Sequence, residues 1–188
     1  MKLNELAIVL ATVLMAAPAG AQQTAKFTRI DCGTSELLMP PNLICLASNE
    51  VAGDLAGGSA GGVFKYWNAI GRVGSRKAYV YGVESMDGRS EVRVTQDLKE
   101  AIDIITPYAK PASHFSDLKR VGDADVVAFT GGAGEACVAI RKLGPARSTG
   151  YRWVAFGLLC DPSLLCDPTG KTLAENDLFS FVHNVGFR

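Results

Sequence analysis

Apolar side chains in the segment 63–70 recur at the spacing of a helix. Val63, Phe64, Trp67 and Ile70 fall on one face of such a helix. Because a repeat of three to four residues is typical of an amphipathic helix, we expect a short helix here that packs Trp67 inward.

Two later segments carry stronger helical patterns. Between residues 98 and 108 apolar residues follow the i, i+3, i+4, i+7 rule, and Pro111 ends the predicted helix. Near the C-terminus, Thr172 and Glu175 form a T-x-x-E capping box that precedes an apolar stripe. We expect this last helix to bury its stripe on a sheet. The stripe consists of Leu178, Phe181, Val182 and Val185.

Strand patterns occupy most of the rest of the chain. Residues 77–95 alternate between apolar and polar positions around an Asp87-Gly88 turn signal, which predicts two antiparallel strands. Three further β-rich runs follow at 125–130, 136–142 and 151–159. The glycine-rich connections between these three runs are too short for a crossover helix, so the strands should be antiparallel neighbours.

The order of these elements, β-β-α-β-β-β-α, predicts the fold class. We expect an α+β fold in which an antiparallel sheet of about five strands is packed by two or three helices and stapled by disulfides. The 167 residues that follow residue 21 are an ordinary size for one domain, so 22–188 is expected to be a single globular unit.

The first 21 residues have the pattern of an export signal. Lys2 precedes a nearly uninterrupted apolar run from Leu6 to Ala17, and small residues follow Pro18. A run of about 12 residues is too short to cross a bilayer as a helix, so we expect a signal peptide that is cleaved near Ala21. The mature protein should therefore be periplasmic or secreted and should not span the membrane.

All five cysteines lie after this segment, where an oxidising compartment favours disulfides. Cys32 and Cys45 bracket a segment that must turn at Pro40-Pro41, so we pair them. Cys137 and Cys160 lie on neighbouring predicted strands and form the second expected pair. Cys166 is then a possible free thiol, and a Cys160–Cys166 disulfide is the alternative that the sequence leaves open.

Composition excludes several classes of function. Lys plus Arg and Asp plus Glu number 19 each, so no net charge favours nucleic acid as a partner. Only two histidines are present, and neither acidic pairs nor cysteine spacing indicates a metal site. Gly132-Ala133-Gly134 departs from the dinucleotide-binding pattern because a strand-like run follows it. We therefore expect no metal and no cofactor.

One enzymatic hypothesis rests on a G-x-S-x-G sequence centred on Ser59. In α/β hydrolases this turn exposes a nucleophilic serine, and the acid and the histidine follow it along the chain. Asp161 or Asp167, and then His183, occur in that order here. The segment before Ser59 is not strand-like, however, and glycine-rich segments produce this pattern by chance.

The favoured hypothesis is a small recognition domain without a catalytic set. Its partner is expected to be an unknown protein, another envelope component or a small ligand. Loops on a rigid scaffold commonly carry recognition, so the loops at 53–62 and 160–170 are the first candidates for the contact surface. The aromatic residues are expected mainly in the core, unless a subset is exposed. They include Tyr66, Trp67, Tyr79, Tyr81, Tyr151 and Trp153.

Overall fold

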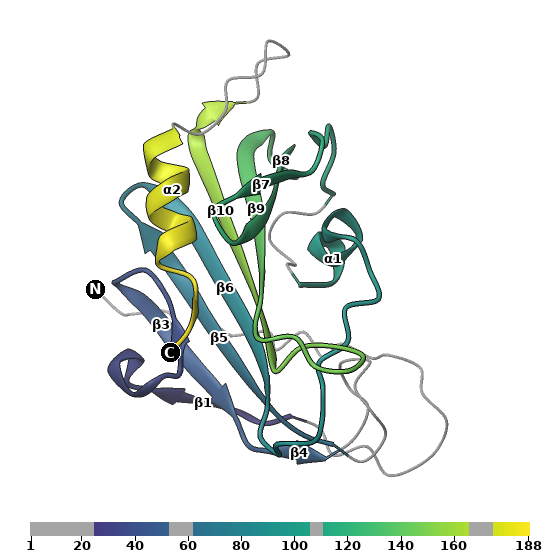
Figure 1. Cartoon of the computed structure of the whole chain (residues 1–188). Coiled ribbons are helices and arrows are strands. Elements are labelled where there is room, and N and C mark those ends of the chain that lie inside the picture. The colour runs from purple at the N-terminus through teal and green to yellow at the C-terminus, as the bar shows by residue number, and fades with distance from the viewer. Residues whose placement is uncertain (1–24, 53–61, 106–110, 166–174) are drawn as a thin grey trace, which may run out of the picture.

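Extended segments rich in β-branched and aromatic residues dominate the fold, and nine of them form one antiparallel sheet (Figure 1). The computed structural model describes residues 25–52, 62–105, 111–165 and 175–188. The strands within these ranges are β1 (Phe27–Ile30), β2 (Leu37–Leu38), β3 (Leu43–Ser48), β4 (Val51–Ala52), β5 (Val63–Val73), β6 (Arg76–Ser85), β7 (Lys119–Val121), β8 (Ala124–Thr130), β9 (Glu135–Leu143), β10 (Trp153–Leu165) and β11 (Gly186–Phe187). The helices are the 3₁₀ turn η1 (Cys32–Thr34), α1 (Leu98–Ile105) and α2 (Glu175–His183).

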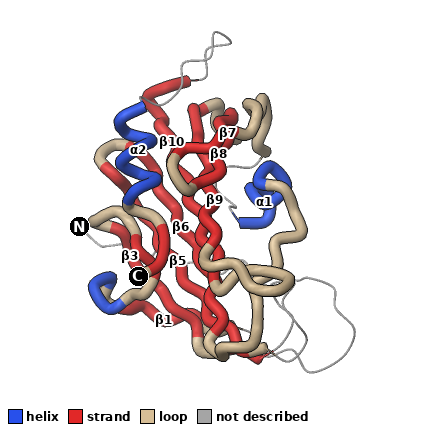
Figure 2. The backbone as a smooth tube through the Cα atoms, in the orientation of Figure 1, coloured by secondary structure: helices blue, strands red, loops and turns tan. Residues whose placement is uncertain are grey.

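The main sheet has the strand order β1-β3-β5-β6-β10-β9-β8-β7, and β4 pairs with β5 beside this path. Strands β6 and β10 meet at the centre, so the first half of the sheet comes from the N-terminal part of the chain and the second from the C-terminal part. Strands β2 and β11 form a separate pair. In Figure 2, strands, drawn in red, make up most of the coloured backbone.

The expected α+β class, with about five strands under two or three packing helices, is wrong. The sheet has nine strands, and the described residues contain only two short α-helices. The main cause is the N-terminal part of the chain, where β1, β3 and β4 supply strands that the sequence patterns did not reveal. These strands are short, and β3 is buried on both sides at its end, so they show little alternation.

Two local expectations are also wrong. Residues 63–70 form the first part of β5 rather than a helix, and the burial of Tyr66 and Ala69 breaks the helical spacing. The strand expected around Val92 does not pair with β6, which lies between β5 and β10 instead. Val92 forms only an isolated bridge to Tyr151. The helix prediction for β5 failed because this strand is partly covered on both faces and therefore carries apolar residues on both. Over a short stretch, such a pattern fits the period of a helix as well as that of a strand.

The other strand and helix predictions agree with the structure. The three β-rich runs between 125 and 159 correspond to β8, β9 and β10, which are antiparallel neighbours. The segment from 98 forms α1, and the C-terminal segment forms α2. Phe181, Val182 and Val185 are buried, as the apolar stripe predicted.

One face of the sheet is covered by α2 and by the β2–β11 pair. Glycines on the two central strands make this close approach possible. A methyl group on Gly157 would lie 2.9 Å from a ring carbon of Phe181, and one on Gly82 would lie 2.8 Å from atoms of both Leu37 and Phe187. Buried residues from strands β3 to β10 join these side chains in one core.

The opposite face is covered by α1, but only over the second half of the sheet. Leu98 and Ile102 of α1 pack with Val127, Ala139 and Leu158 of strands β8 to β10. In Figure 1, α1 and α2 lie on opposite sides of the sheet. The first half of the sheet, from β3 to β6, is therefore not covered by α1.

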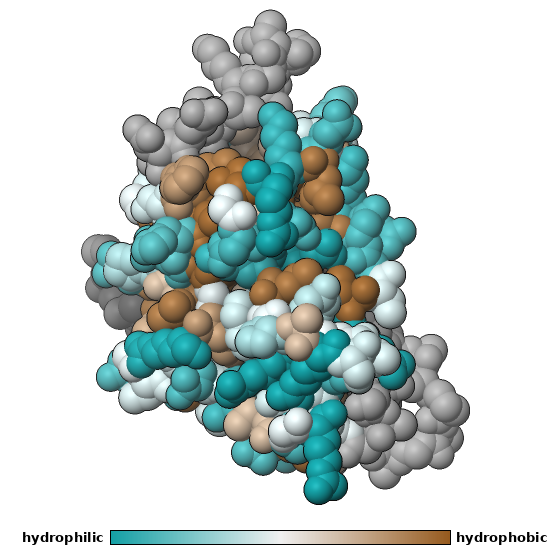
Figure 3. Space-filling view, viewed as in Figure 1, coloured by the Kyte–Doolittle hydropathy of each residue, from teal (hydrophilic) through white to brown (hydrophobic). Residues whose placement is uncertain are grey.

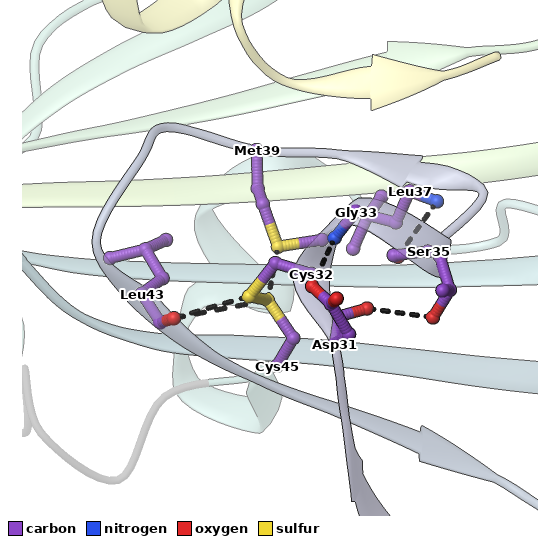
Figure 4. The surroundings of a disulfide bond; sticks show 9 residues. Asp31, Cys32, Gly33, Ser35, Leu37, Met39, Leu43 and Cys45 are labelled. Carbon is purple, nitrogen blue, oxygen red and sulfur yellow. Dashed lines mark hydrogen bonds between the residues drawn. A yellow bond between two sulfur atoms is a disulfide. The ribbon is translucent and has the colours of Figure 1, made fainter.

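Two disulfides join elements of the sheet. Cys32, directly after β1, is bonded to Cys45 of β3, and Cys137 of β9 is bonded to Cys160 of β10. Figure 4 shows the first disulfide, where Met39 Sδ lies 2.9 Å from Cys45 Sγ. In the turn that leads to Cys32, the Asp31 carboxylate accepts a hydrogen bond from the Gly33 N–H at 2.9 Å. The turn and the disulfide together fix β1 at the edge of the sheet.

The expected signal peptide lies outside the described residues. Within the described residues, no helix combines the length and apolar character needed to cross a bilayer.

Candidate functional site

A row of facing side chains runs across the sheet on the side of α1. Strand register aligns Ile44 of β3 with Ile70 of β5 and Tyr79 of β6. The row continues through Leu158 of β10 to Ala139 of β9. Ile44 is 46% exposed and Leu158 only 5%, with intermediate exposure for Ile70 and Tyr79 between them. Exposure increases along the row as it leaves the area under α1.

A second row lies beside the first on the same face. Register aligns Leu46, Asn68, Tyr81 and Phe156, and all four side chains are partly exposed. The two rows are connected by a hydrogen bond in which the Tyr79 hydroxyl donates to Asn68 Oδ1 at 2.8 Å. The two rows together form a surface that we call the open face. It consists of Ile44, Leu46, Asn68, Ile70, Tyr79, Tyr81 and Phe156.

The tyrosine hydroxyl on the second row stays protonated into alkaline solution. Burial raises the pKa of Tyr81 well above its usual value of 10.0, and the neighbouring Tyr66 and Tyr79 raise it further. The Tyr81 ring also lies 6.3 Å from the Tyr66 ring and 6.4 Å from the Phe156 ring, centre to centre. The open face is thus electrically neutral, with aromatic rings held by their neighbours.

Charged residues lie at both ends of the second row. Arg29 of β1 faces Leu46 at one end and is exposed. At the other end, Arg141 faces Phe156 and donates to the Asp125 carboxylate at 2.9 Å. Arg141 also donates to the Gln96 carbonyl, which precedes α1, at 3.0 Å. This ion pair marks where the open face ends and the cover of α1 begins.

Between α1 and the open face lies a pocket of about 10 Å³, which is the size of one water molecule. Its lining includes Tyr79, Leu98, Ile102 and Phe156. A pocket of this volume cannot hold a small organic ligand, because such sites enclose several hundred Å³. Within the part of the chain that the structure describes, this pocket therefore does not give the open face a cavity for such a ligand.

The opposite side of the molecule differs in character. On the side seen in Figure 3, apolar residues reach the surface in areas interrupted by hydrophilic ones. Phe179 of α2 is the most exposed large apolar side chain of the described residues, at 64%. It is one residue on a helix whose other apolar residues face inward, and single exposed apolar residues are normal on protein surfaces.

A second group of side chains that could bind a ligand surrounds the disulfide between β9 and β10. Glu135, Cys137 and Cys160 are all buried, and their carboxylate oxygen and sulfur atoms lie within 4.8 Å of one another. The Ala133 N–H donates to Glu135 Oε2 at 2.9 Å, and Lys77 Nζ lies 3.9 Å from Glu135 Oε1. While the sulfurs are bonded to each other, neither is a thiolate, so the group offers a metal ion only one anionic ligand.

The residues of the hydrolase hypothesis are only partly within the described ranges. Ser59 and Asp167 lie outside them, as does Cys166. His183 is exposed at the last residue of α2, and Asp161 is buried on β10, where its carboxylate accepts a hydrogen bond from Arg76 Nε at 2.9 Å. An aspartate in an ion pair with arginine has its charge already balanced. The described residues therefore add no support to this hypothesis.

Two features of the site were missed from the sequence. Ile44 and Ile70 join the open face only through the register of three strands, and no local pattern marks them. Glu135 carried a usable signal, because it precedes Cys137 by two residues and alternation places both on one face of a strand. Of the two loops expected to carry recognition, 53–61 and 166–170 lie outside the described residues, whereas 160–165 form the end of strand β10 and not a loop.

Comparison of the chain with protein-family models, with curated proteins and with solved structures gave no match.

Proposed function

We propose that this chain is an exported recognition domain that binds a protein partner of the cell envelope through the open face. The observation that carries the proposal is the exposure of Ile44, at 46%, in line with the partly exposed Ile70 and Tyr79. Apolar surface in contact with water favours burial, and contiguous apolar surface on a soluble fold is typical of an interaction site.

The composition of the open face favours a protein over a sugar polymer. Aromatic rings suit either partner, because both a sugar ring and a side chain can stack on them. Ile44, Leu46 and Ile70 are aliphatic, and they offer a sugar neither stacking nor hydrogen bonds. Aliphatic and aromatic side chains around a few polar groups are typical of the centre of protein interfaces. Asn68, which accepts a hydrogen bond from the Tyr79 hydroxyl, supplies such a polar group here.

The support beneath the open face favours binding without rearrangement. Strand β3 is tied to the segment after β1 by the Cys32–Cys45 disulfide, and β5 and β6 pair along ten residues. A rigid surface loses little conformational entropy when a partner binds, which increases affinity for a given contact area. The disulfides also fit an oxidising compartment, as the expected signal peptide does.

Photo-crosslinking in the producing cell tests the proposal. A benzophenone amino acid is placed at position 44, at position 70, or at position 179 on the exposed surface of α2. The matched comparison is Phe179, because it is the more exposed apolar residue but lies on the other side of the sheet. We expect a discrete protein adduct from positions 44 and 70 and none from position 179.

A second variant makes the test specific. Ile70→Asp, combined with the crosslinker at position 44, should abolish the adduct because a carboxylate in the row opposes burial of the surface. Retention of the adduct in this variant, or an equal adduct from position 179, would contradict the proposal. Absence of any adduct from positions 44 and 70 in folded, exported protein would contradict it as well.

A further inference from the structure

We infer that Glu135, Cys137 and Cys160 form a redox-gated Zn²⁺ site, which is closed while the disulfide is intact and opens when the disulfide is reduced. The first support is geometry. Cys137 and Cys160 are directly facing residues of neighbouring strands, with Cα atoms 4.1 Å apart. Glu135 lies two residues before Cys137, so its side chain is on the same side of β9. All three residues are at least 97% buried.

The backbone around these side chains is shaped to let the carboxylate and the sulfur meet. A methyl group on Gly131 would lie 2.8 Å from the Glu135 carboxyl carbon and 2.9 Å from Cys137 Sγ. A side chain at position 131 would therefore clash with both groups, so glycine is needed there for the Glu135 carboxylate and Cys137 Sγ to lie side by side. Its N–H donates to the Glu135 carbonyl at 2.9 Å, which holds the turn over the cluster.

The ligand atoms suit zinc once the disulfide is reduced. Zn²⁺ binds thiolate sulfur at about 2.3 Å and carboxylate oxygen at about 2.0–2.2 Å in a tetrahedral arrangement. Two such sulfurs around one ion are separated by about 3.8 Å. The three ligand atoms lie within 4.8 Å of one another, so the sulfurs need only a small side-chain movement after the bond breaks. A fourth position remains open for water or an external ligand.

Charge in the cluster also balances with a divalent ion. Two thiolates and the Glu135 carboxylate carry three negative charges. Zn²⁺ supplies two positive charges, and the Lys77 ammonium group, 3.9 Å from Glu135 Oε1, supplies the third. A buried charge is tolerated when it is paired with an opposite charge or hydrogen-bonded. Without a metal ion, the Glu135 carboxylate is balanced by Lys77 and the Ala133 N–H. With Zn²⁺ bound, all charges of the cluster are paired.

Opening the site needs an external dithiol as the reductant. The dithiol gives two electrons and two protons to the Cys137–Cys160 bond and closes to its own disulfide, which leaves two cysteine thiols. Binding of Zn²⁺ then releases both thiol protons to water. The Cys137–Cys160 pair is followed by the Asp161–Ala136 pair, after which the register between β9 and β10 shifts, so local opening of this end of the ladder would admit the dithiol. Irregular strand ends open more readily than regular ladders.

The test is a metal titration of the full-length protein before and after reduction with dithiothreitol, which is then removed under argon. Co²⁺ serves as the coloured probe, because thiolate ligands give it a charge-transfer band, and Zn²⁺ is then added to displace it. We expect one Co²⁺ per reduced chain with thiolate absorption, full displacement by Zn²⁺, and no band in the oxidised protein. Binding by the oxidised protein would overturn the inference.

Variants identify the ligands. Cys137→Ser and Cys160→Ser should each lose the band, and Glu135→Gln should weaken Co²⁺ binding by about tenfold or more. The matched controls are Cys32→Ser, from the other disulfide, and Cys166→Ser, and both should bind as the reduced parent does. Loss of the band in either control, or unchanged affinity in Glu135→Gln, would overturn the inference.

A second measurement covers the case in which reduction unfolds the chain. Near-ultraviolet circular dichroism follows the packing of aromatic residues during the titration, and alkylation with mass spectrometry reports which thiols Zn²⁺ protects. We expect Zn²⁺ to restore the native spectrum and to protect Cys137 and Cys160 but not Cys32 or Cys45. A reduced chain that stays unfolded with Zn²⁺ would overturn the inference.

Discussion

Ile44 and Val127 occupy the same row of facing side chains in the sheet, yet Ile44 is 46% exposed and Val127 is fully buried. The two residues are of similar size and polarity, so the difference arises from what covers them. Helix α1 covers the row at β8 to β10 and leaves it uncovered at β3 and β5. One sheet face thus serves as core at one end and as candidate contact surface at the other.

This relationship predicts that substitutions along one row reduce stability by very different amounts. Ile44→Ser should lower the free energy of unfolding by about 1 kcal/mol, because nearly half of the residue is already in contact with water. Leu158→Ala should cost about 2–5 kcal/mol, because it removes buried apolar atoms and leaves a cavity under α1. Urea unfolding of both variants checks this. A large loss in Ile44→Ser would mean that the open face is covered in the folded chain.

The glycines under α2 give a second prediction. Gly157→Ala places a methyl group 2.9 Å from both Phe181 and Ile140, so the helix or the strand has to move. We expect a loss of about 1–3 kcal/mol in stability, as for other overpacked cores. Gly88→Ala is the control, since a methyl group there meets nothing within 4 Å. Thermal unfolding should separate the two variants clearly, and equal melting temperatures would contradict this account of the packing.

Sequence patterns predicted the C-terminal half of the fold better than the N-terminal half. Strands β8, β9 and β10 are long and connected by short glycine-rich turns, so each strand and its antiparallel neighbour could be inferred together. Strand β5 was expected as a helix because its apolar residues fit both periods. Pairing with β3 and β6 on its two sides makes this segment a strand. That pairing depends on the tertiary structure and cannot be inferred from the segment alone.

The same limit explains why the open face was not predicted. Ile44, Ile70 and Tyr79 are separated in sequence by 26 and 9 residues, and the apolar neighbours that each has along the chain do not show which side of the sheet it will face. They meet only when three strands align in one register. The cysteine pairs needed less information, because a required turn brings Cys32 toward Cys45 and facing strands bring Cys137 to Cys160.

Removal of the Cys32–Cys45 disulfide should loosen the edge of the sheet. The bond closes a segment of 13 residues, so the Cys32→Ala and Cys45→Ala double variant should lose about 3 kcal/mol of stability. The loss should concentrate at β1, which among the described strands pairs only with β3 in the main sheet. Hydrogen exchange checks this by comparing amides of β1 with those of β9. A uniform loss of protection across both strands would show that the disulfide stabilises the whole sheet rather than its edge.

Stability should fall with acid because a carboxylate holds two loops together. Glu91 accepts hydrogen bonds from the Ser148 hydroxyl at 2.6 Å and from the Thr149 hydroxyl and N–H at 2.6 and 2.8 Å. These bonds, with that from Ser148 the largest cause, lower the pKa of Glu91 from 4.5 to about 2. A carboxylate with a lowered pKa in the folded state stabilises the fold above its unfolded pKa. That contribution is lost as pH falls from 4.5 toward 2.

Glu91→Gln tests this directly, because an amide cannot titrate. Its melting temperature should be below that of the parent at pH 7 and should fall less than the parent's between pH 4.5 and pH 2. Asp87 contributes acid sensitivity of its own, since hydrogen bonds led by that from the Ser90 side chain lower its pKa from 3.8 to about 2. The variant should therefore keep part of the parent's slope. Ser116→Ala is the control, because that hydroxyl bonds backbone groups only, so it should lower the melting temperature equally at both pH values. A Glu91→Gln variant with the full slope of the parent would assign the acid sensitivity to other carboxylates.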